Sequence, residues 1–149
     1  MQSALRVSRV TLPTSLARAT HRTMACKDDA VLELINKQLR LYNARDLDAF
    51  MEMFSEDVHV SDTVTGAVLA RSKAELRPRY EARFSSPVHC ELVGRLALGN
   101  VVVDREIITG LPDDGVAECM ATYLVCPDSM KIKTVQFVWK ARTFGVKMH

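Results

Sequence analysis

Four strand-like segments follow one another, with no helical pattern between them, in the C-terminal half of the chain. They cover residues 89–98, 101–109, 116–126 and 131–139. The dipeptide Gly99-Asn100 between the first two is typical of a two-residue β-hairpin, and clusters of Pro, Asp, Ser and Gly separate the others. The pattern predicts a four-stranded antiparallel meander, and any fold proposed for the chain has to accommodate it.

The segment before the meander has helical periodicity. Val31, Ile35, Leu39 and Tyr42 recur at the spacing of one helix face and predict a helix that begins at Asp28. A second, short helix is expected after Asp46, with its apolar positions listed here: Leu47, Phe50, Met51 and Phe54.

A third helix is expected from residue 72 onward. Ser72 and Glu75 form a capping box, in which each side chain accepts a hydrogen bond from an otherwise unpaired backbone N–H group. Residues 58–62 and 64–69, which precede it, predict a strand and a short return strand. Three helices before or between strands, followed by a meander, predict an α+β fold in which helices cover one face of a curved antiparallel sheet.

The 149 residues suffice for one domain on the rough scale of 100 to 200 residues per domain. Residues 1–23 contain four Arg and no acidic residue among Ser, Thr, Ala and Leu. This composition is typical of a mitochondrial or plastid transit peptide, and the alternatives are a disordered extension or a start at Met24 in the cytoplasm. We therefore expect residues 24–149 to form the domain.

Several function classes find no support in the sequence. No apolar run reaches the roughly 18 to 20 residues that span a bilayer, and the basic residues concentrate in residues 1–23 instead of on a face for nucleic acid. The four cysteines form no C-x-x-C pair, so no metal site is expected. Phosphate-binding loops and known nucleophile motifs are also missing from the sequence, so we expect no cofactor.

Asp62 is the first candidate for chemistry. It shares a strand face with Val58 and Val60, because side chains two residues apart point the same way. One interpretation is a pocket acid whose pKa rises through desolvation, which would let it move protons near neutral pH. The other interpretation is a turn-forming residue at the end of a strand.

Two further patterns leave alternatives open. In the strand 101–109, either Arg105 or the pair Asp104 and Glu106 must face inward, and we expect the pair on the outer face. Phe137 and Trp139 lie on one strand face and either line a cavity or fill a core.

The arrangement resembles the nuclear transport factor 2-like superfamily, in particular its SnoaL-like and ketosteroid isomerase-like branch. Three segments carry the resemblance: the YNARDLDAF run, the FSEDVHVSD stretch and the GNVVVDREIITG hairpin. The resemblance implies a cone-like α+β barrel, a deep apolar pocket and, commonly, a homodimer. Both faces of residues 116–126 carry apolar side chains, which agrees with one face lining a pocket and the other meeting a partner subunit.

The resemblance also suggests site residues. Asp62 falls where the isomerases have their base, whereas their two oxyanion-hole donors are replaced by Gln38 and Thr122. Tyr42, one turn after Gln38, is a candidate for a replacement hydroxyl donor. The expected pocket is completed by side chains in phase with these positions: Val60, Met120, Phe137 and Trp139.

The sequence leaves two function classes open. The first is an enzyme that binds a small hydrophobic or carbonyl-bearing molecule and performs isomerisation, cyclisation or dehydration without a cofactor, with Asp62 as general base. The second is a ligand-binding or dimeric interaction module with the same pocket and no catalysis, because the fold alone does not determine the function.

Overall fold

The computed structural model describes residues 14–112 and 115–140, with side chains from Lys27 onward. Its elements follow in chain order: α1 (Thr14–Ala44), α2 (Leu47–Met51), β1 (Phe54–Asp62), β2 (Val68–Ala70), α3 (Lys73–Phe84), β3 (His89–Leu98), β4 (Val101–Thr109), β5 (Ala117–Cys126) and β6 (Lys131–Trp139). The described residues thus contain three helices and six strands, and the predicted α+β class is confirmed.

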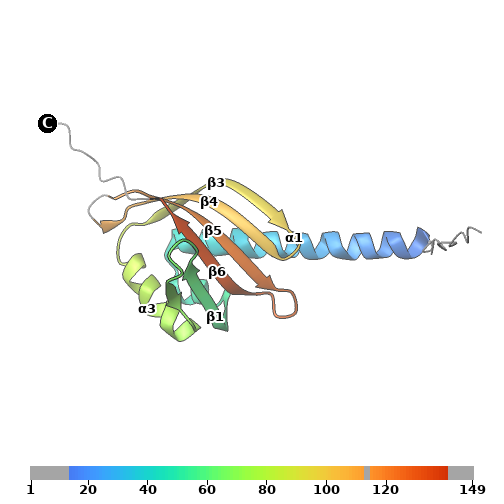
Figure 1. The fold of residues 1–149 in the computed structure, drawn as a ribbon, viewed down its shortest axis with the longest axis horizontal. Helices are drawn as coiled ribbons and strands as arrows, with labels where there is room; N and C mark the ends of the chain where they lie inside the picture. Colours follow the sequence, from blue (N-terminus) through green and yellow to red (C-terminus); the bar gives the residue numbers. More distant parts are fainter. Residues whose placement is uncertain (1–13, 113–114, 141–149) are drawn as a thin grey trace, which may run out of the picture.

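The six strands form one sheet in the order β2-β1-β6-β5-β4-β3. All neighbouring strands are antiparallel except β1 and β6, which run parallel. The predicted meander is therefore confirmed as β3 to β6. The sheet curves around α1 (Figure 1) but is open, with β2 and β3 as its edges, so the cone-like shape is that of a curved sheet and not of a closed barrel.

Helix α1 packs against the concave side of this sheet through most of the stripe that its sequence predicts, with Gln38 buried and the predicted Leu39 half-buried. Val31, Ile35, Gln38 and Tyr42 are the buried positions, each at helical spacing from the next. The N-terminal part of the helix projects beyond the sheet (Figure 1). Lys27 to Ala30 are exposed, so burial of α1 side chains in the described part begins at Val31.

This helix overlaps the predicted leader. Residues 1–13 lie outside the described residues, and α1 begins at Thr14 instead of Asp28. The last ten residues of the predicted leader, 14–23, are therefore helical in backbone.

The predicted caps of α2 and α3 are confirmed. The Asp46 carboxylate accepts a hydrogen bond from the Ala49 N–H at 3.2 Å, and Ser72 Oγ accepts one from the Glu75 N–H at 3.1 Å. Phe54, which we expected on the second helix, is instead the first residue of β1. It still packs on Phe50 of α2, with ring centroids 5.1 Å apart, because both rings enter the same core.

The edge strand β3 is held at its start by the end of α1. The Asn43 side chain donates to the Cys90 carbonyl at 3.0 Å and accepts from the Cys90 N–H at 2.7 Å. These bonds satisfy backbone groups that an edge strand would otherwise leave unpaired. They also fix the start of β3 to α1, and Cys90 is paired with Ile108, a residue of the candidate site.

A glycine after β4 allows close packing at the same end. Gly110 has a φ of 70°, and a Cβ there would lie 2.0 Å from the Pro87 carbonyl oxygen. The position therefore requires glycine for both its backbone conformation and its surroundings.

Candidate functional site

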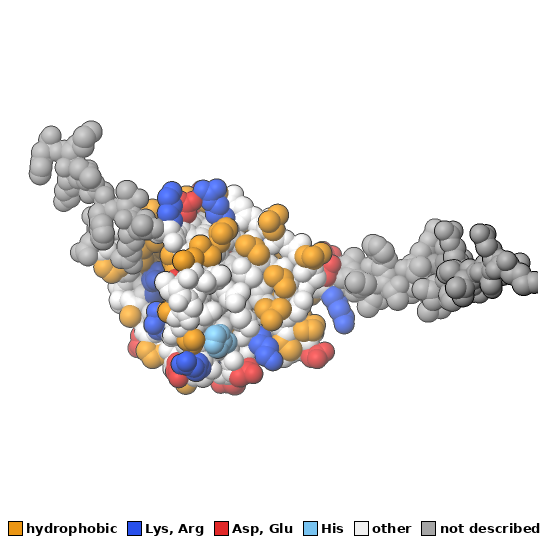
Figure 2. Space-filling view, in the orientation of Figure 1, with side chains coloured by type: hydrophobic (Ala, Val, Ile, Leu, Met, Phe, Trp, Pro, Cys, Tyr) orange, Lys and Arg blue, Asp and Glu red, His pale blue; other side chains and the backbone are white. Residues whose placement is uncertain are grey.

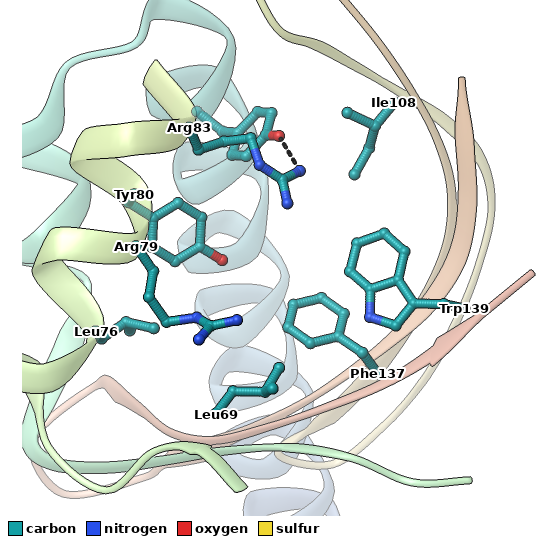
Figure 3. Close-up of a pocket in the computed structure, with 9 residues that line it drawn as sticks. Leu69, Leu76, Arg79, Tyr80, Arg83, Ile108, Phe137 and Trp139 are labelled. Atoms are coloured by element: carbon teal, nitrogen blue, oxygen red, sulfur yellow. Dashed lines mark hydrogen bonds between the residues drawn. The ribbon is translucent and has the colours of Figure 1, made fainter. Parts of the chain in front are cut away.

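A small cavity of about 80 Å³ lies between α3 and the inner face of the sheet. Tyr80 of α3 lies on one side, and Phe137 and Trp139 of β6 form the opposite wall (Figure 3). Tyr42 of α1 also lines the cavity. The Phe137 and Trp139 rings stack with centroids 5.2 Å apart at 30°. A second cavity of about 150 Å³ adjoins it and shares Arg83 and Trp139. The site therefore offers a flat aromatic wall to a small molecule.

Two arginines of α3 point into this cavity from the side opposite Trp139 (Figure 3). Arg83 donates to the Tyr42 hydroxyl oxygen at 3.5 Å. Among the residues that the structure describes, no carboxylate lies within 4.0 Å of either Arg79 or Arg83. The mouth of the cavity is thus positively charged.

Strand β4 carries the acidic part of the site. Its buried positions are Val102, Asp104, Glu106 and Ile108, so the expectation that Asp104 and Glu106 lie on the outer face is wrong. Both acids face inward because each has a hydrogen-bond donor there: Arg95 for Asp104 and Tyr123 for Glu106. Ile108 lines the cavity, and Glu106 is the next inward-facing residue on the same strand. The Glu106 side chain therefore lies next to Ile108 on the inner face of β4, and it is not among the residues that line the cavity.

Glu106 is held by two side chains of β5. The Tyr123 hydroxyl donates to its Oε1 at 3.3 Å, and Cys119 Sγ lies 3.6 Å from Oε2. The residue is only 4% exposed, and burial, followed by the charge of Asp104, raises the pKa of Glu106 to about 7. Both the acid and the carboxylate form are then populated near neutral pH, as a group that accepts and returns a proton requires.

Burial also shifts the pKa values of the neighbouring groups. It raises the pKa of Tyr42 to about 12 and raises those of Cys90 and Cys119 as well. These hydroxyl and thiol groups therefore stay neutral and act as hydrogen-bond donors, and Glu106 is the group in this cluster whose protonation changes near pH 7.

Asp104 forms an ion pair with Arg95 of β3. Arg95 donates to both of its carboxylate oxygens, from Nε at 2.6 Å and from Nη2 at 2.7 Å, and also contacts Asn36 of α1. A β-bulge between Leu92 and Gly94 shifts the alternation of β3 and turns Arg95 inward. The bulge therefore supplies the partner that allows Asp104 to be buried.

Asp62 has the environment of the turn-forming alternative. Its Oδ1 accepts from the Val64 N–H at 2.9 Å and from the Thr65 N–H at 2.8 Å. The bond from Thr65 is the main reason why the pKa of Asp62 is lowered and not raised as the pocket-acid interpretation expects. The carboxylate lies at the β1–β2 turn and does not line the cavity.

The other sequence-predicted residues divide between the two sides of the sheet. Tyr42, Phe137 and Trp139 come together around the cavity. Gln38 and Val60 are buried in the core outside the cavity lining. Met120 and Thr122 lie on the outer face of β5, since Cys119, Ala121 and Tyr123 are the buried phase, and the structure does not bring them to the cavity.

Sequence reasoning missed Glu106, Arg79 and Arg83 as site residues. A signal existed for the arginines, because they lie on the helix face that carries Leu76 and Tyr80. For Glu106 the sequence signal was weak. Both faces of the strand 101–109 combine apolar and charged residues, so the pattern alone does not show which face is buried.

Within residues 14–112 and 115–140, no group of three or more His, Cys, Asp or Glu side chains is arranged to hold a metal ion. None of the helices in the same residues is long and apolar enough to span a membrane.

The sequence matches the SnoaL-like domain family over residues 35–128. The match covers more than half of the chain, and this protein belongs to the SnoaL-like family. No curated protein matches the sequence significantly.

Solved structures share the fold at low sequence identity. The epoxide hydrolase/cyclase-like enzyme SalBIII, which takes part in pyran ring formation in the polyether salinomycin, has a TM-score of 0.67 and 22% identity over 77% of this chain and 95% of its own. A candidate ketosteroid isomerase from Kribbella flavida has a TM-score of 0.67 and 16% identity over 82% and 85%. An uncharacterised cystatin-fold protein from Novosphingobium aromaticivorans has a TM-score of 0.64 and 23% identity over 72% and 97%. These similarities show the fold alone.

Proposed function

We propose that this protein binds a small carbonyl-bearing molecule in the cavity beside Trp139 and catalyses proton transfer at the carbon next to the carbonyl. Glu106 is the proposed general base and acid. The buried position of this carboxyl group next to the cavity residue Ile108 on the inner face of β4, with a pKa of about 7, is the observation that carries the proposal. Cyclases and isomerases among the structural neighbours agree with chemistry of this kind.

The proposed reaction needs no cofactor. The Glu106 carboxylate removes a proton from the carbon, the electron pair of the C–H bond forms a C=C bond to the carbonyl carbon, and the π electron pair of the carbonyl moves to its oxygen, which gives an enolate. The protonated Glu106 then returns the proton to the same or a conjugated carbon, which completes an isomerisation or an exchange with no net change in atoms or electrons.

The negative charge that develops on the oxygen needs donors. Tyr42 is the proposed donor, because its hydroxyl oxygen already accepts from Arg83 and its proton is free to point to a ligand in the cavity. A donor placed in advance at such an oxygen typically contributes a factor of about 100 to 1,000 in rate.

The size of the cavity restricts the substrate. Pockets for drug-sized ligands usually enclose about 300 to 1,000 Å³, whereas this cavity holds about 80 Å³ with about 150 Å³ beside it. A molecule with one ring and a short side chain fits the aromatic wall better than a fused-ring steroid does.

Phenylacetone is a suitable probe, since it combines one ring with a carbonyl and exchangeable benzylic protons. Proton NMR in D2O should show that the wild-type protein accelerates their exchange and that Glu106→Gln does not. Equal exchange by the two proteins would remove Glu106 from the proposal and return Asp62 to the position of candidate base. No acceleration by the wild type would favour the alternative of a non-catalytic binding module.

We also propose a homodimer that forms through the outer face of the sheet. Leu96 and Leu98 of β3 are 76% and 86% exposed, and Met120 of β5 is 46% exposed. Figure 2 shows hydrophobic side chains gathered on the sheet face opposite α1. An exposed apolar area of this kind is typical of an interaction surface.

Residues 1–23 remain a proposed leader for import into a mitochondrion or plastid, on the strength of their Arg-rich, acid-free composition. If translation starts at Met24 instead, the protein is proposed to be cytoplasmic. Expression of the full chain and of the Met24 form as fluorescent fusions would distinguish the two.

A further inference from the structure

Two arginines of α3, Arg79 and Arg83, line the cavity close to each other, an arrangement that is electrostatically unfavourable. Arg79 and Arg83 lie four residues apart on α3, so their charges repel each other on one helix face. Both line the cavity and point toward its aromatic wall (Figure 3), Arg79 at an exposed position and Arg83 at a half-buried one.

Several other arginines in the described part of the chain have carboxylate partners. Arg77, on the same helix, pairs with Asp48, and Arg95 is bound by both oxygens of Asp104. Arg83, by contrast, has one long hydrogen bond to Tyr42, and the nearby carboxyl of Glu106 is occupied by Tyr123 and Cys119. The two guanidinium groups at the mouth are thus available to an anion from outside.

From this geometry we infer that the substrate carries a carboxylate, bound by Arg83 and Arg79 while its ring lies on Trp139 and Phe137. A guanidinium group matches a carboxylate through two parallel N–H···O bonds, and its planar shape suits a position opposite an aromatic wall. The inference rests on the proposed function and adds the substrate class: a small cyclic or aromatic carboxylic acid with a carbonyl near Glu106.

The arrangement also orients the substrate. With the carboxylate beside the arginines and the ring on Trp139, the remaining part of the molecule lies toward Ile108, the cavity residue next to Glu106 on β4. The anion is thereby kept away from Glu106, whose ionised form, the form that can accept a proton, a nearby negative charge would disfavour.

Binding is measurable without knowledge of the natural substrate, because Trp139 is the single tryptophan of the chain and lines the cavity. Quenching of its fluorescence by phenylacetate and by phenylacetamide compares the same ring with and without a charge. Because hydrogen bonds between charged groups are stronger than those to a neutral amide, phenylacetate should bind about 10- to 100-fold more tightly than phenylacetamide.

The variants assign this preference to the arginines. Arg83→Gln and Arg79→Gln should each weaken phenylacetate binding toward the phenylacetamide level and leave phenylacetamide binding unchanged. Arg83→Lys, which keeps the charge, should retain part of the preference. Arg77→Gln removes an arginine from the same helix at an exposed position and serves as the matched control, with no change in either affinity. Thermal melting of each variant separates lost binding from lost folding.

The outcomes separate the inference from the function on which it rests. Equal binding of phenylacetate and phenylacetamide, or a preference that persists in the double variant Arg79→Gln and Arg83→Gln, would overturn the carboxylate site and leave the pocket intact. Absence of quenching by either compound would overturn the proposed pocket and the carboxylate site together.

Discussion

Tyr123 of β5 and Glu106 of β4 meet diagonally on the inner face of the sheet, and the tyrosine hydroxyl donates to the buried carboxyl oxygen at 3.3 Å. The pair lies on the inner face of the sheet and includes Glu106, the proposed general base. The hydrogen bond satisfies a carboxyl group that burial would otherwise penalise heavily, and it leaves that group able to bind or release a proton.

The Glu106 pKa predicts a dependence of stability on pH. In the folded protein the Glu106 carboxyl keeps its proton up to about pH 7, whereas in the unfolded chain it loses the proton near pH 4.5. The free energy of unfolding should therefore fall as the pH rises across that interval. The whole shift corresponds to about 3 kcal/mol. Urea unfolding at several pH values should show this loss in the wild type and not in Glu106→Gln. Glu81→Gln, at an exposed position of α3, is the control, and parallel curves for wild type and Glu106→Gln would contradict the prediction.

The Arg95 and Asp104 pair should be essential to stability. Arg95→Met leaves a carboxylate with 1% side-chain exposure without its partner, which typically costs about 3 to 5 kcal/mol. Replacing both residues, as Arg95→Met with Asp104→Leu, should recover most of this loss. Urea denaturation measures all three proteins, and a loss below about 1 kcal/mol in Arg95→Met would show that the pair is not needed.

The outer face of β3 should hold a homodimer together. Leu96→Asp and Leu98→Asp place charges in the proposed interface and should convert a dimer into a monomer in light scattering at micromolar concentration. Val64→Asp is the matched control, because Val64 is 74% exposed at the β1–β2 turn, away from this face. A wild-type mass equal to that of a single chain would refute the dimer.

Residues before Met24 should contribute little to the stability of the domain. Lys27 to Ala30 are exposed and burial in the described part of α1 begins at Val31, so a chain that starts at Met24 should melt at the temperature of the full chain. Differential scanning calorimetry tests this. A decrease of more than about 3 °C, equivalent to about 1 kcal/mol in a domain of this size, would place the segment within the folded unit.

The strands and helices were predictable because their signals are local. Gly99-Asn100 fixes one hairpin, and Ser72 with Glu75 fixes the start of α3, whatever the rest of the chain does. The parallel pairing of β1 with β6 was not predictable, since it joins segments more than seventy residues apart.

The direction of β4 required information from other strands. Its outer face carries Val101, Val103 and Ile107, which on hydrophobicity alone would favour burial over the face with Asp104 and Glu106. The inward face is decided by Tyr123 on β5 and by Arg95, which reaches Asp104 only because of the bulge in β3. The role of Asp62 could not be decided from the sequence either, because a carboxylate at the end of a strand has the same sequence pattern in a turn and in a pocket.

The most direct test of the account is the pH profile of benzylic proton exchange in phenylacetone, measured by NMR in D2O. If Glu106 is the base, the rate should rise with pH about a midpoint near 7, should be lost in Glu106→Gln and should persist in Asp62→Asn, which keeps an oxygen for the turn. If Asp62 is the base, its lowered pKa predicts a rate that is independent of pH through this range. A flat profile that is lost in Asp62→Asn and retained in Glu106→Gln would contradict the account.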